Sequence, residues 1–372
     1  MDQYPLPELQ ANTIAVGFDV HKYTHTGVAI DIFGKELDSL EFSNQNLDLA
    51  TTWLTKFKQA APLIVGIEDV HGYGCHLAKA LVNQGFVVRF SPAKLTDSER
   101  HHSNRKDKTD HLDAKRVAEV IVHKMDETLP ADPILSDDQV HLRSLDLLIQ
   151  ERGNLVKDQT ELKNQLHTLL HQYYGDRYRQ EYPNIFSLKA IASYTKDLSH
   201  STRELSPSRT FIGEDVTYLK AAILRRFSRL TLMKQQIKEL NQLIDQLSQR
   251  VPETKKLKDN LVGCGSLTAA KIMVEIKTIK RFNSASKLAR YGGFAPITYH
   301  SAKSGRCCAD MGGNRRLNQA VHVIALSQIG ARKLALSVNY FNKKTKEGKT
   351  KMWAIRCLKR QLINRIYNLL RY

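Results

Sequence analysis

The sequence predicts an α/β domain at the N-terminus, followed by long helices and a mainly helical C-terminal domain. Three observations support this fold class. Short apolar segments alternate with helical periodicity up to about residue 140, leucines and isoleucines then recur every seven residues, and glycine-punctuated helical sequence follows. With 372 residues, of which 42% are apolar, the chain is long enough for two or three domains with buried cores.

The first domain, residues 1–140, is predicted to contain a mixed sheet flanked by helices. Short apolar or alternating segments predict strands at residues 14–20, 26–30, 37–42, 63–68 and 86–90. Helical periodicity predicts helices at residues 47–58, 75–83 and 110–123. The resulting order, β-β-β-α-β-α-β-α, is that of a ribonuclease-H-like domain.

Residues 141–250 are predicted to form long helices that pair along apolar seams. One seam is Leu148, Leu155, Leu162 and Leu169, and the other is Ile223, Leu230, Ile237 and Ile244. A seven-residue repeat is typical of a coiled coil, but a helical hairpin within one chain gives the same pattern. We expect a coiled-coil linker that brings subunits together, and the intramolecular alternative stays open.

The third domain, residues 251–372, is predicted to be mainly helical and to begin with a phosphate-binding turn. Gly263 and Gly265 are spaced as in a helix-hairpin-helix turn, in which backbone N–H groups of the second helix meet a phosphate. An ordinary glycine-containing turn between two packed helices is the alternative interpretation.

The charge distribution indicates that the partner is a nucleic acid. The chain carries 56 Lys and Arg against 38 Asp and Glu, a net charge of +18. Residues 301–372 hold only two acidic residues, Asp310 and Glu347, so the excess lies at the C-terminal end. A basic footprint of this kind attracts phosphate backbones, and no amphipathic aromatic face accompanies it to suggest a membrane surface.

Composition also bears on the cellular compartment. The five cysteines form no C-x-x-C pair and are odd in number, which argues against a zinc ribbon and a disulfide framework. The N-terminus has neither a basic region nor an apolar segment typical of a secretion signal, and no apolar run is long enough to span a bilayer. We therefore expect reduced thiols and a cytoplasmic protein.

Four carboxylates are predicted to converge in the first domain. Asp19 lies at the end of the first strand, Glu68 ends the fourth, and Asp110 and Asp113 share one face at the start of a helix. In a ribonuclease-H-like sheet the first and fourth strands are neighbours, so these four carboxylates would meet. Clustered carboxylates repel one another unless a cation lies among them, and oxygen ligands suit Mg²⁺ or Mn²⁺.

Two sets of short motifs occur in the first and third domains. The first set is Gly-Phe-Asp19-Val-His-Lys, Ile-Glu68-Asp-Val-His-Gly and Lys-Thr-Asp110-His-Leu-Asp113-Ala. The second set is Tyr-Gly-Gly-Phe-Ala-Pro296, Ser301 and Gly-Gly313-Asn-Arg-Arg-Leu-Asn. In this order, and over about residues 14 to 370, the two sets resemble the signature of the DEDD transposases, insertion-sequence recombinases related to Piv-type invertases.

The resemblance implies a RuvC-like domain with an acidic tetrad, a coiled-coil linker and a transposase domain with a nucleophilic serine. Asp19, Glu68, Asp110 and Asp113 would bind Mg²⁺ or Mn²⁺, and Ser301 would attack a DNA phosphodiester to give a phosphoserine intermediate. Family members excise and insert mobile DNA under the guidance of a bridge RNA. The partners would be donor and target DNA, the guide RNA and further copies of the chain, as a dimer or a synaptic tetramer.

The identity of the nucleophile depends on how the sequence is aligned. The distances from Pro296 and from Gly313 both select Ser301, whereas the Ser-Gly dipeptide found in many relatives selects Ser304. We favour Ser301. Three nearby arginines would hold the scissile phosphate or its neighbours, because the guanidinium fork matches phosphate and few acidic residues lie close in the sequence. These arginines are Arg306, Arg315 and Arg316.

Two other functions fit the same residues. A metal-dependent nuclease or junction resolvase would use the carboxylates alone to activate water and would need no serine. A non-catalytic RNA-binding scaffold would keep the fold without the chemistry, and its binding would not depend on Asp19 or Glu68.

Overall fold

The computed structural model describes residues 6–68, 72–102, 109–131, 140–200, 214–301, 304–308, 310 and 312–372. The chain forms two compact units. The first comprises residues 1–140, 256–264 and 272–372, and the second comprises residues 141–255 and 265–271. No helix in the described part of the chain is long and apolar enough to cross a membrane.

The N-terminal part of the first unit is built on a six-stranded mixed sheet in the order β3-β2-β1-β4-β5-β6. The strands are β1 (Ile14–Val20), β2 (Thr24–Ile30), β3 (Glu36–Ser43), β4 (Leu63–Ile67), β5 (Val87–Phe90) and β6 (Leu129–Pro130). The central pair, β1 and β4, is parallel, and β1–β2, β2–β3 and β5–β6 are antiparallel. The predicted strands and helices occur in the predicted order, and the structure adds β6 and a helix at Ala93–His102 that we did not predict.

Helices cover the sheet and bury its apolar residues. They are α1 (Leu47–Ala60), α2 (Cys75–Asn83), α3 (Ala93–His102), α4 (Asp110–Lys124) and the 3-10 turn η1 (Met125–Glu127). Phe18 packs in one core with residues of α1 and α2, such as Trp53 and Leu77. Ala15 of β1 points to the opposite face of the sheet from Phe18 and packs in another core with Ile121 of α4. Because side chains alternate along a strand, odd-numbered residues of β1 face α4.

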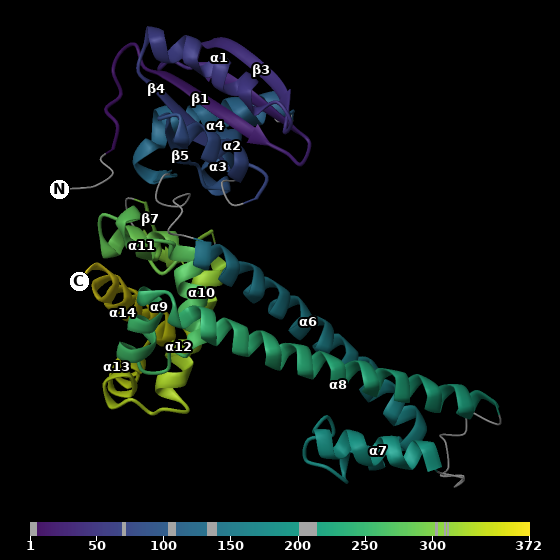
Figure 1. Ribbon diagram of the computed structural model, residues 1–372. Coiled ribbons are helices and arrows are strands. Elements are labelled where there is room, and N and C mark those ends of the chain that lie inside the picture. Colours follow the sequence, from purple (N-terminus) through teal and green to yellow (C-terminus); the bar gives the residue numbers. More distant parts are fainter. Residues whose placement is uncertain are drawn as a thin grey trace. The chain divides into compact units, whose positions relative to one another are not determined.

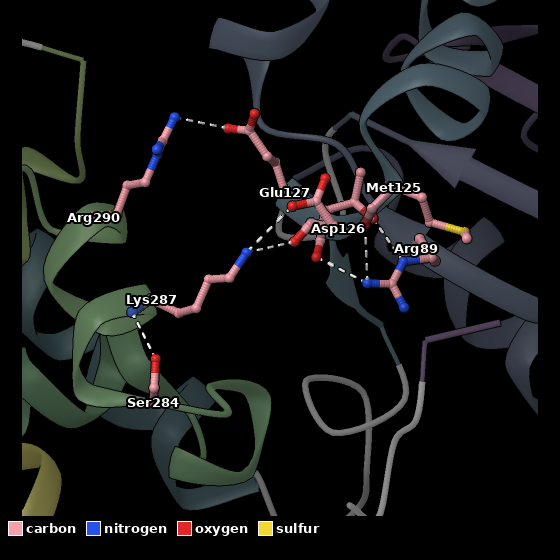
Figure 2. Close-up of polar contacts among 8 residues, drawn as sticks. Arg89, Met125, Asp126, Glu127, Ser284, Lys287 and Arg290 are labelled. Atoms are coloured by element: carbon pink, nitrogen blue, oxygen red, sulfur yellow. Dashed lines mark hydrogen bonds and ion pairs between the residues drawn. The ribbon is translucent and has the colours of Figure 1, made fainter. Parts of the chain in front are cut away.

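The 3-10 turn η1 contacts a buried arginine through its backbone and two exposed cations of α11 (Ala285–Tyr291) through its acidic side chains (Figure 2). Arg89 of β5 is buried and donates from Nη2 to the first carbonyl of η1 at 3.5 Å. Lys287 Nζ lies 3.4 Å from Asp126 Oδ2, and Arg290 Nη2 lies 3.2 Å from Glu127 Oε2. Both ion pairs are solvent-exposed, and such pairs are worth at most about 1 kcal/mol each.

The second unit is dominated by two long helices that run side by side, α6 (Val140–Tyr174) and α8 (Glu214–Gln249) (Figure 1). The turn η3 (Gly175–Arg179) and α7 (Leu188–His200) complete it. Leu166 of α6, Tyr194 of α7 and Phe227 of α8 share one core, and Arg152 Nε donates to Asn241 Oδ1 at 2.6 Å. The two long helices therefore pack against each other within one chain.

The predicted heptad seams are buried to different degrees. In α8, three of the four seam residues are buried, Ile223, Leu230 and Ile244, whereas in α6 only Leu162 is. The other seam leucines of α6 are half-buried, because Leu145, Ile149 and Leu166 take the buried positions instead. The structure thus shows a helical hairpin, and a coiled coil between subunits stays a prediction.

The C-terminal part of the chain is mainly helical, as predicted. It contains α9 (Pro252–Asn260), α10 (Ser266–Ile276), η4 (Ile279–Arg281), α11 (Ala285–Tyr291), α12 (Arg315–Ile329), α13 (Ala335–Lys346) and α14 (Lys351–Arg371). Leu288 of α11, Ile324 of α12 and Ile363 of α14 are fully buried. A two-stranded antiparallel hairpin, β7 (Ile297–Ser301) and β8 (Ser304–Cys308), which we did not predict, separates α11 from α12.

Candidate functional site

Two of the predicted carboxylates lie at the ends of neighbouring parallel strands. Phe18 of β1 pairs with Ile67 of β4, so the next residues along each strand, Asp19 and Glu68, are level with each other. Asp19 faces α4, because Phe18 before it faces the opposite core. The carboxyl ends of parallel strands are a common place for functional side chains, and here the sequence supplies two acids.

Two glycines let α4 lie directly on this part of the sheet. A Cβ built on Gly17 would lie 2.1 Å from the carbonyl oxygen of Ala114, and one built on Gly66 would lie 2.8 Å from Ile121 Cγ1. No other residue type leaves this space for a helix. The first turn of α4 begins at Asp110, after Thr109 caps the helix by accepting from Leu112 N at 3.2 Å, and so reaches the end of β1.

Asp19, His21 and Asp110 form a compact group of possible metal ligands. His21 Nε2 lies 3.2 Å from Asp19 Oδ2 and 3.4 Å from Asp110 Oδ1, and one ligand atom of each residue falls within 4.8 Å of the others. Asp19 is mostly covered, whereas His21 and Asp110 are exposed and accessible. We did not predict His21. It directly follows β1 and comes two residues after Asp19, a spacing that would have identified it if the alternation of side chains is continued past the strand end.

Asp113 adds negative charge near this group, but its carboxylate forms an ion pair with Arg116. It is buried, and Arg116 Nη1 lies 2.6 Å from its Oδ1 one turn along the helix. A paired buried carboxylate keeps its position at lower cost than an isolated one. Of the four predicted acids, the structure brings Asp19 and Asp110 together, with Glu68 at the adjoining strand end.

The surroundings disfavour the negative charge of Asp19. Burial raises the pKa of its carboxyl group above the ordinary value, and the charges of Asp110 and Asp113 raise it further, while His21 acts in the opposite direction. A divalent cation would relieve this crowding. The carboxylate oxygens present are ligands that suit Mg²⁺ or Mn²⁺, and His21 adds one imidazole nitrogen.

A polar cavity of about 410 Å³ adjoins the carboxylates. It is lined by Thr26, Ser39, Leu40, Glu41, Thr109, Asp110 and His111. His111 Nε2 is held 2.8 Å from Glu36 Oε1 of β3. A substrate approaching Asp110 thus finds a recess with hydroxyl groups on its wall.

The two candidate nucleophiles lie at the tip of the β7–β8 hairpin. Ser301 is the last residue of β7, Ser304 is the first of β8, and the two pair directly across the hairpin. Arg306 follows on β8, opposite Tyr299. Residues 302 and 303, and the side chains of Ser301, Ser304 and Arg306, lie outside the described part of the structure. The backbone therefore places both serines at one tip and does not choose between them.

Glycines also fix the base of this hairpin. A Cβ on Gly313 would lie 2.2 Å from the backbone N of Gly293, so the segments that enter and leave the hairpin touch through their backbones. Asn314 caps α12 by accepting from Leu317 N at 2.9 Å, and its amide donates to Tyr291 Oη at 3.0 Å. Asn314 thereby orders the turn between Gly313 and α12.

Arg316, one of the three arginines predicted to hold phosphate, forms an ion pair that its sequence neighbours did not indicate. Its Nε lies 2.9 Å from Glu275 Oε1 on α10, a residue far away in the sequence. The Asn314 amide donates to the other oxygen of the same carboxylate at 2.7 Å. Arg315, by contrast, lines a large cavity of the C-terminal part.

The predicted helix-hairpin-helix turn is a turn between two helices, as expected. Gly263 follows α9 and has a φ of +84°, which favours glycine, and Gly265 directly precedes α10. A Cβ on Gly263 would also press on Ser327 Oγ at 3.0 Å. The positive φ and the close approach of Ser327 explain why a glycine stands at position 263. Contact of this turn with a phosphate stays a prediction.

Two family models match the chain. A model of DEDD transposases of the IS110 type, described as "Transposase", matches residues 16–175, which include the four carboxylates and His21. A second, described as "Transposase IS116/IS110/IS902 family", matches residues 257–341, which include both candidate serines.

Two insertion-element proteins of streptomycetes are similar to the chain. The 43.6 kDa protein of insertion element IS110 from Streptomyces coelicolor is 33% identical over 146 residues, 39% of this chain and 35% of that protein. The 44.8 kDa protein of insertion element IS116 from Streptomyces clavuligerus is 23% identical over 392 aligned residues, 96% of this chain and 94% of that protein. The first match is thus local, and the second spans both chains.

Proposed function

The chain belongs to the DEDD transposases of IS110-type insertion elements, and on this premise we propose that it excises and inserts mobile DNA through a serine-linked intermediate, guided by a bridge RNA. Transposases cut and rejoin DNA strands. The observation that carries the proposal is the group of Asp19, His21 and Asp110 at the end of β1, in a chain that also presents two serines on one hairpin tip.

The carboxylate group supplies the site for a divalent cation. Asp19, Glu68 and Asp110 would hold Mg²⁺ or Mn²⁺, with His21 as a nitrogen donor and the charge of Asp113 behind them. When bound, the ion would draw charge from the phosphodiester oxygens. Nε2 of His21 lies 3.2 Å from Asp19 Oδ2 and 3.4 Å from Asp110 Oδ1, close enough to share one cation with both carboxylates.

In the proposed reaction, Ser301 Oγ forms an ester bond to phosphorus as one P–O bond of the DNA breaks. The serine loses a proton and the departing DNA oxygen gains one. The hydroxyl end of another strand then displaces the serine and reverses both changes, so the number of phosphate esters is conserved and no energy-rich cofactor is needed. Arg306, Arg315 and Arg316 would hold the phosphate or its neighbours.

A covalent-adduct assay tests this mechanism. Wild type, Ser301→Ala and Ser304→Ala are incubated with the element's DNA ends, its flanking RNA and Mg²⁺, and separated on a denaturing gel. We expect a protein–DNA adduct in wild type and in Ser304→Ala, and none in Ser301→Ala. Asp19→Asn should abolish the adduct in all backgrounds. Cleaved DNA without any adduct would instead establish the metal-dependent nuclease.

The RNA guide requires a separate experiment. The C-terminal excess of basic residues and the turn at Gly263 and Gly265 support binding to nucleic-acid backbones. We expect the flanking RNA to be required for adduct formation, and an RNA with an altered guide segment to redirect it to the matching DNA. Unchanged cutting in the absence of RNA would refute guidance.

Assembly of two or more copies also belongs to the proposal. Leu147 of α6 and Leu243 of α8 are 70% and 47% exposed, so their side chains are available to a second copy of the chain. A dimer through the long helices, and a tetramer when two duplexes are joined, would cover them. Sedimentation velocity should show a dimer for wild type, and a shift toward monomer for Leu147→Gln combined with Leu243→Gln.

A further inference from the structure

The C-terminal part of the first unit contains a cavity of about 590 Å³ whose lining residues, apart from Arg315, have no role in the proposed reaction. Its volume is in the range of pockets that hold one small organic molecule. Basic, amide and aromatic side chains meet on its wall. They include Phe294, Gln319, Tyr340, Trp353, Arg356 and Lys359.

Lys359 gives this cavity a buried positive charge. Its side chain is 7% exposed, and its Nζ donates to Asn318 Oδ1 and lies 5.5 Å from the centroid of the Phe294 ring. Among the described residues no carboxylate pairs with it. A buried ammonium without a counter-ion is costly, so an anion that enters the cavity would gain this interaction.

The rest of the wall is more basic than acidic. Arg315, Arg356 and Arg360 also line the cavity, whereas Asp310 is the single acidic residue among the described residues that line it. The site therefore favours an anionic ligand over a neutral or cationic one. Phosphate is an anion that guanidinium and ammonium groups bind through charge-assisted hydrogen bonds.

Trp353 presents an aromatic surface beside these cations. The ring is half-buried, and the guanidinium of Arg356 lies 5.0 Å from its centroid. Indole rings of this kind stack on nucleobases without strong sequence preference. The amide of Gln319, which makes no hydrogen bond to any described residue, is available for the edge of a base.

We propose that this cavity binds one unpaired nucleotide, with its base against Trp353 and its phosphate on Lys359. The inference rests on the proposed action on nucleic acid. In a duplex both faces of each base are covered by its neighbours, so only a nucleotide that has left the stack can enter such a cavity. The wall continues from Phe294 through Pro296 into β7, which ends at Ser301, so the nucleotide would be held next to the strand of the proposed nucleophile.

Intrinsic fluorescence reports directly on the proposed contact. The chain has two tryptophans, and Trp53 is 5% exposed and donates to Asp38, so it is inaccessible to a ligand. Full-length protein is titrated with a single-stranded DNA, an RNA of the same sequence, the fully paired duplex and a strand of abasic sugars. We expect saturable quenching of Trp353 by the first two only. Preference for DNA or for RNA identifies the source of the nucleotide.

Affinities of labelled oligonucleotides, measured by fluorescence anisotropy, test the assigned residues. Trp353→Ala should weaken binding about tenfold, as expected for one lost base–aromatic stack, and Trp353→Phe should restore most of it. Lys359→Gln should weaken binding and Lys359→Arg should retain it. Arg371→Gln, which removes one positive charge from the same helix outside the cavity, should change affinity less than about twofold.

The inference is overturned if Trp353→Ala and Lys359→Gln bind like wild type, if the abasic strand binds as tightly as the normal one, or if Arg371→Gln loses as much affinity. Circular dichroism checks that each variant is folded, and Trp353→Phe and Lys359→Arg keep the test decisive should the larger changes unfold the chain. Binding is measured without Mg²⁺. If these binding predictions fail while wild type still forms the protein–DNA adduct, the nucleotide site is refuted and the proposed function is not.

Discussion

A Cβ atom built on Gly17 of β1 would lie 2.1 Å from the carbonyl oxygen of Ala114 on α4. Folded proteins do not tolerate this separation, so the absence of a side chain at Gly17 is what allows the helix to touch the strand. Asp19 follows Gly17 by two residues, and Asp113 directly precedes Ala114. The contact between Gly17 and Ala114 therefore sets the distance between carboxylates of the candidate site.

Gly17→Ala should destabilise the protein and separate these carboxylates. The added methyl group forces α4 away from β1, and overpacking of this kind costs about 1–3 kcal/mol of the free energy of unfolding. Urea unfolding followed by circular dichroism measures the loss. Gly153→Ala is the matched control, because a Cβ there meets no atom within 4 Å in the interior of α6. It should stabilise by about 0.5–1 kcal/mol, and a similar gain for Gly17→Ala would contradict the prediction.

The sheet and its carboxylates could be predicted because their signals are local. Asp19 and Glu68 each follow an apolar run, and the order of strands and helices fixes which strands are neighbours. The start of α4 was also visible, since Thr109 and Asp110 are a typical cap and first-turn acid. His21 was missed although the same alternation of side chains that orients Asp19 applies to it.

Other features depend on contacts between residues far apart in the sequence. The β7–β8 hairpin has only two short strands, and its base is held by Gly293 against Gly313, a contact that neither segment reveals alone. The ion pair of Arg316 with Glu275 joins α12 to α10 in the same way. The heptad pattern was visible, but the residues of α6 that are buried include Leu145, Ile149 and Leu166, which lie outside the predicted seam; Leu166 packs in a core with residues of α7 and α8.

Asp19→Asn should remove the effect of divalent cations on stability. In wild type, Mg²⁺ or Mn²⁺ should raise the free energy of unfolding, because the ion binds the folded carboxylate group alone. Without metal the variant should be the more stable protein. The pKa of Asp19 is raised on folding, so the folded state binds more protons than the unfolded chain between the two values, and stability falls as pH rises through that window.

The melting temperatures of wild type and Asp19→Asn are measured without cation and with a cation concentration well above its Kd. Asp158→Asn removes an exposed carboxylate on α6 and should respond to metal like wild type. An equal metal-induced shift in Asp19→Asn would place the cation elsewhere.

Gly313→Ala should impair the serine hairpin without harming the N-terminal sheet. A methyl group at this position would lie 2.2 Å from Gly293 N, so the segments that flank β7 and β8 must move apart. We expect the yield of the protein–DNA adduct to fall at least about tenfold, since displacement by 1 Å can cost far more than that in rate. Metal-induced stabilisation, which depends on Asp19 and not on this hairpin, should be unchanged. A full adduct yield would show that the hairpin's base tolerates the change.

Lys359→Met should change how stability depends on pH in a defined window. Burial, with a smaller contribution from the charge of Arg356, lowers the pKa of Lys359 from its ordinary value of 10.5 to about 8 in the folded protein. Between these values the unfolded chain binds the extra proton, so the lysine makes the free energy of unfolding rise with pH. Below pH 8 both states are charged, and the folded state bears the cost of the buried ammonium.

The methionine variant should therefore be more stable than wild type below pH 8, with the difference shrinking as pH rises toward 10.5. Urea unfolding at a series of pH values measures it, and subtraction of the two curves removes the titration of other lysines and tyrosines. Lys351→Met, an exposed change at the start of the same helix, should leave the curve of wild type unaltered. Parallel curves for Lys359→Met and wild type would show that Lys359 stays charged in the folded protein because an anion or water reaches it.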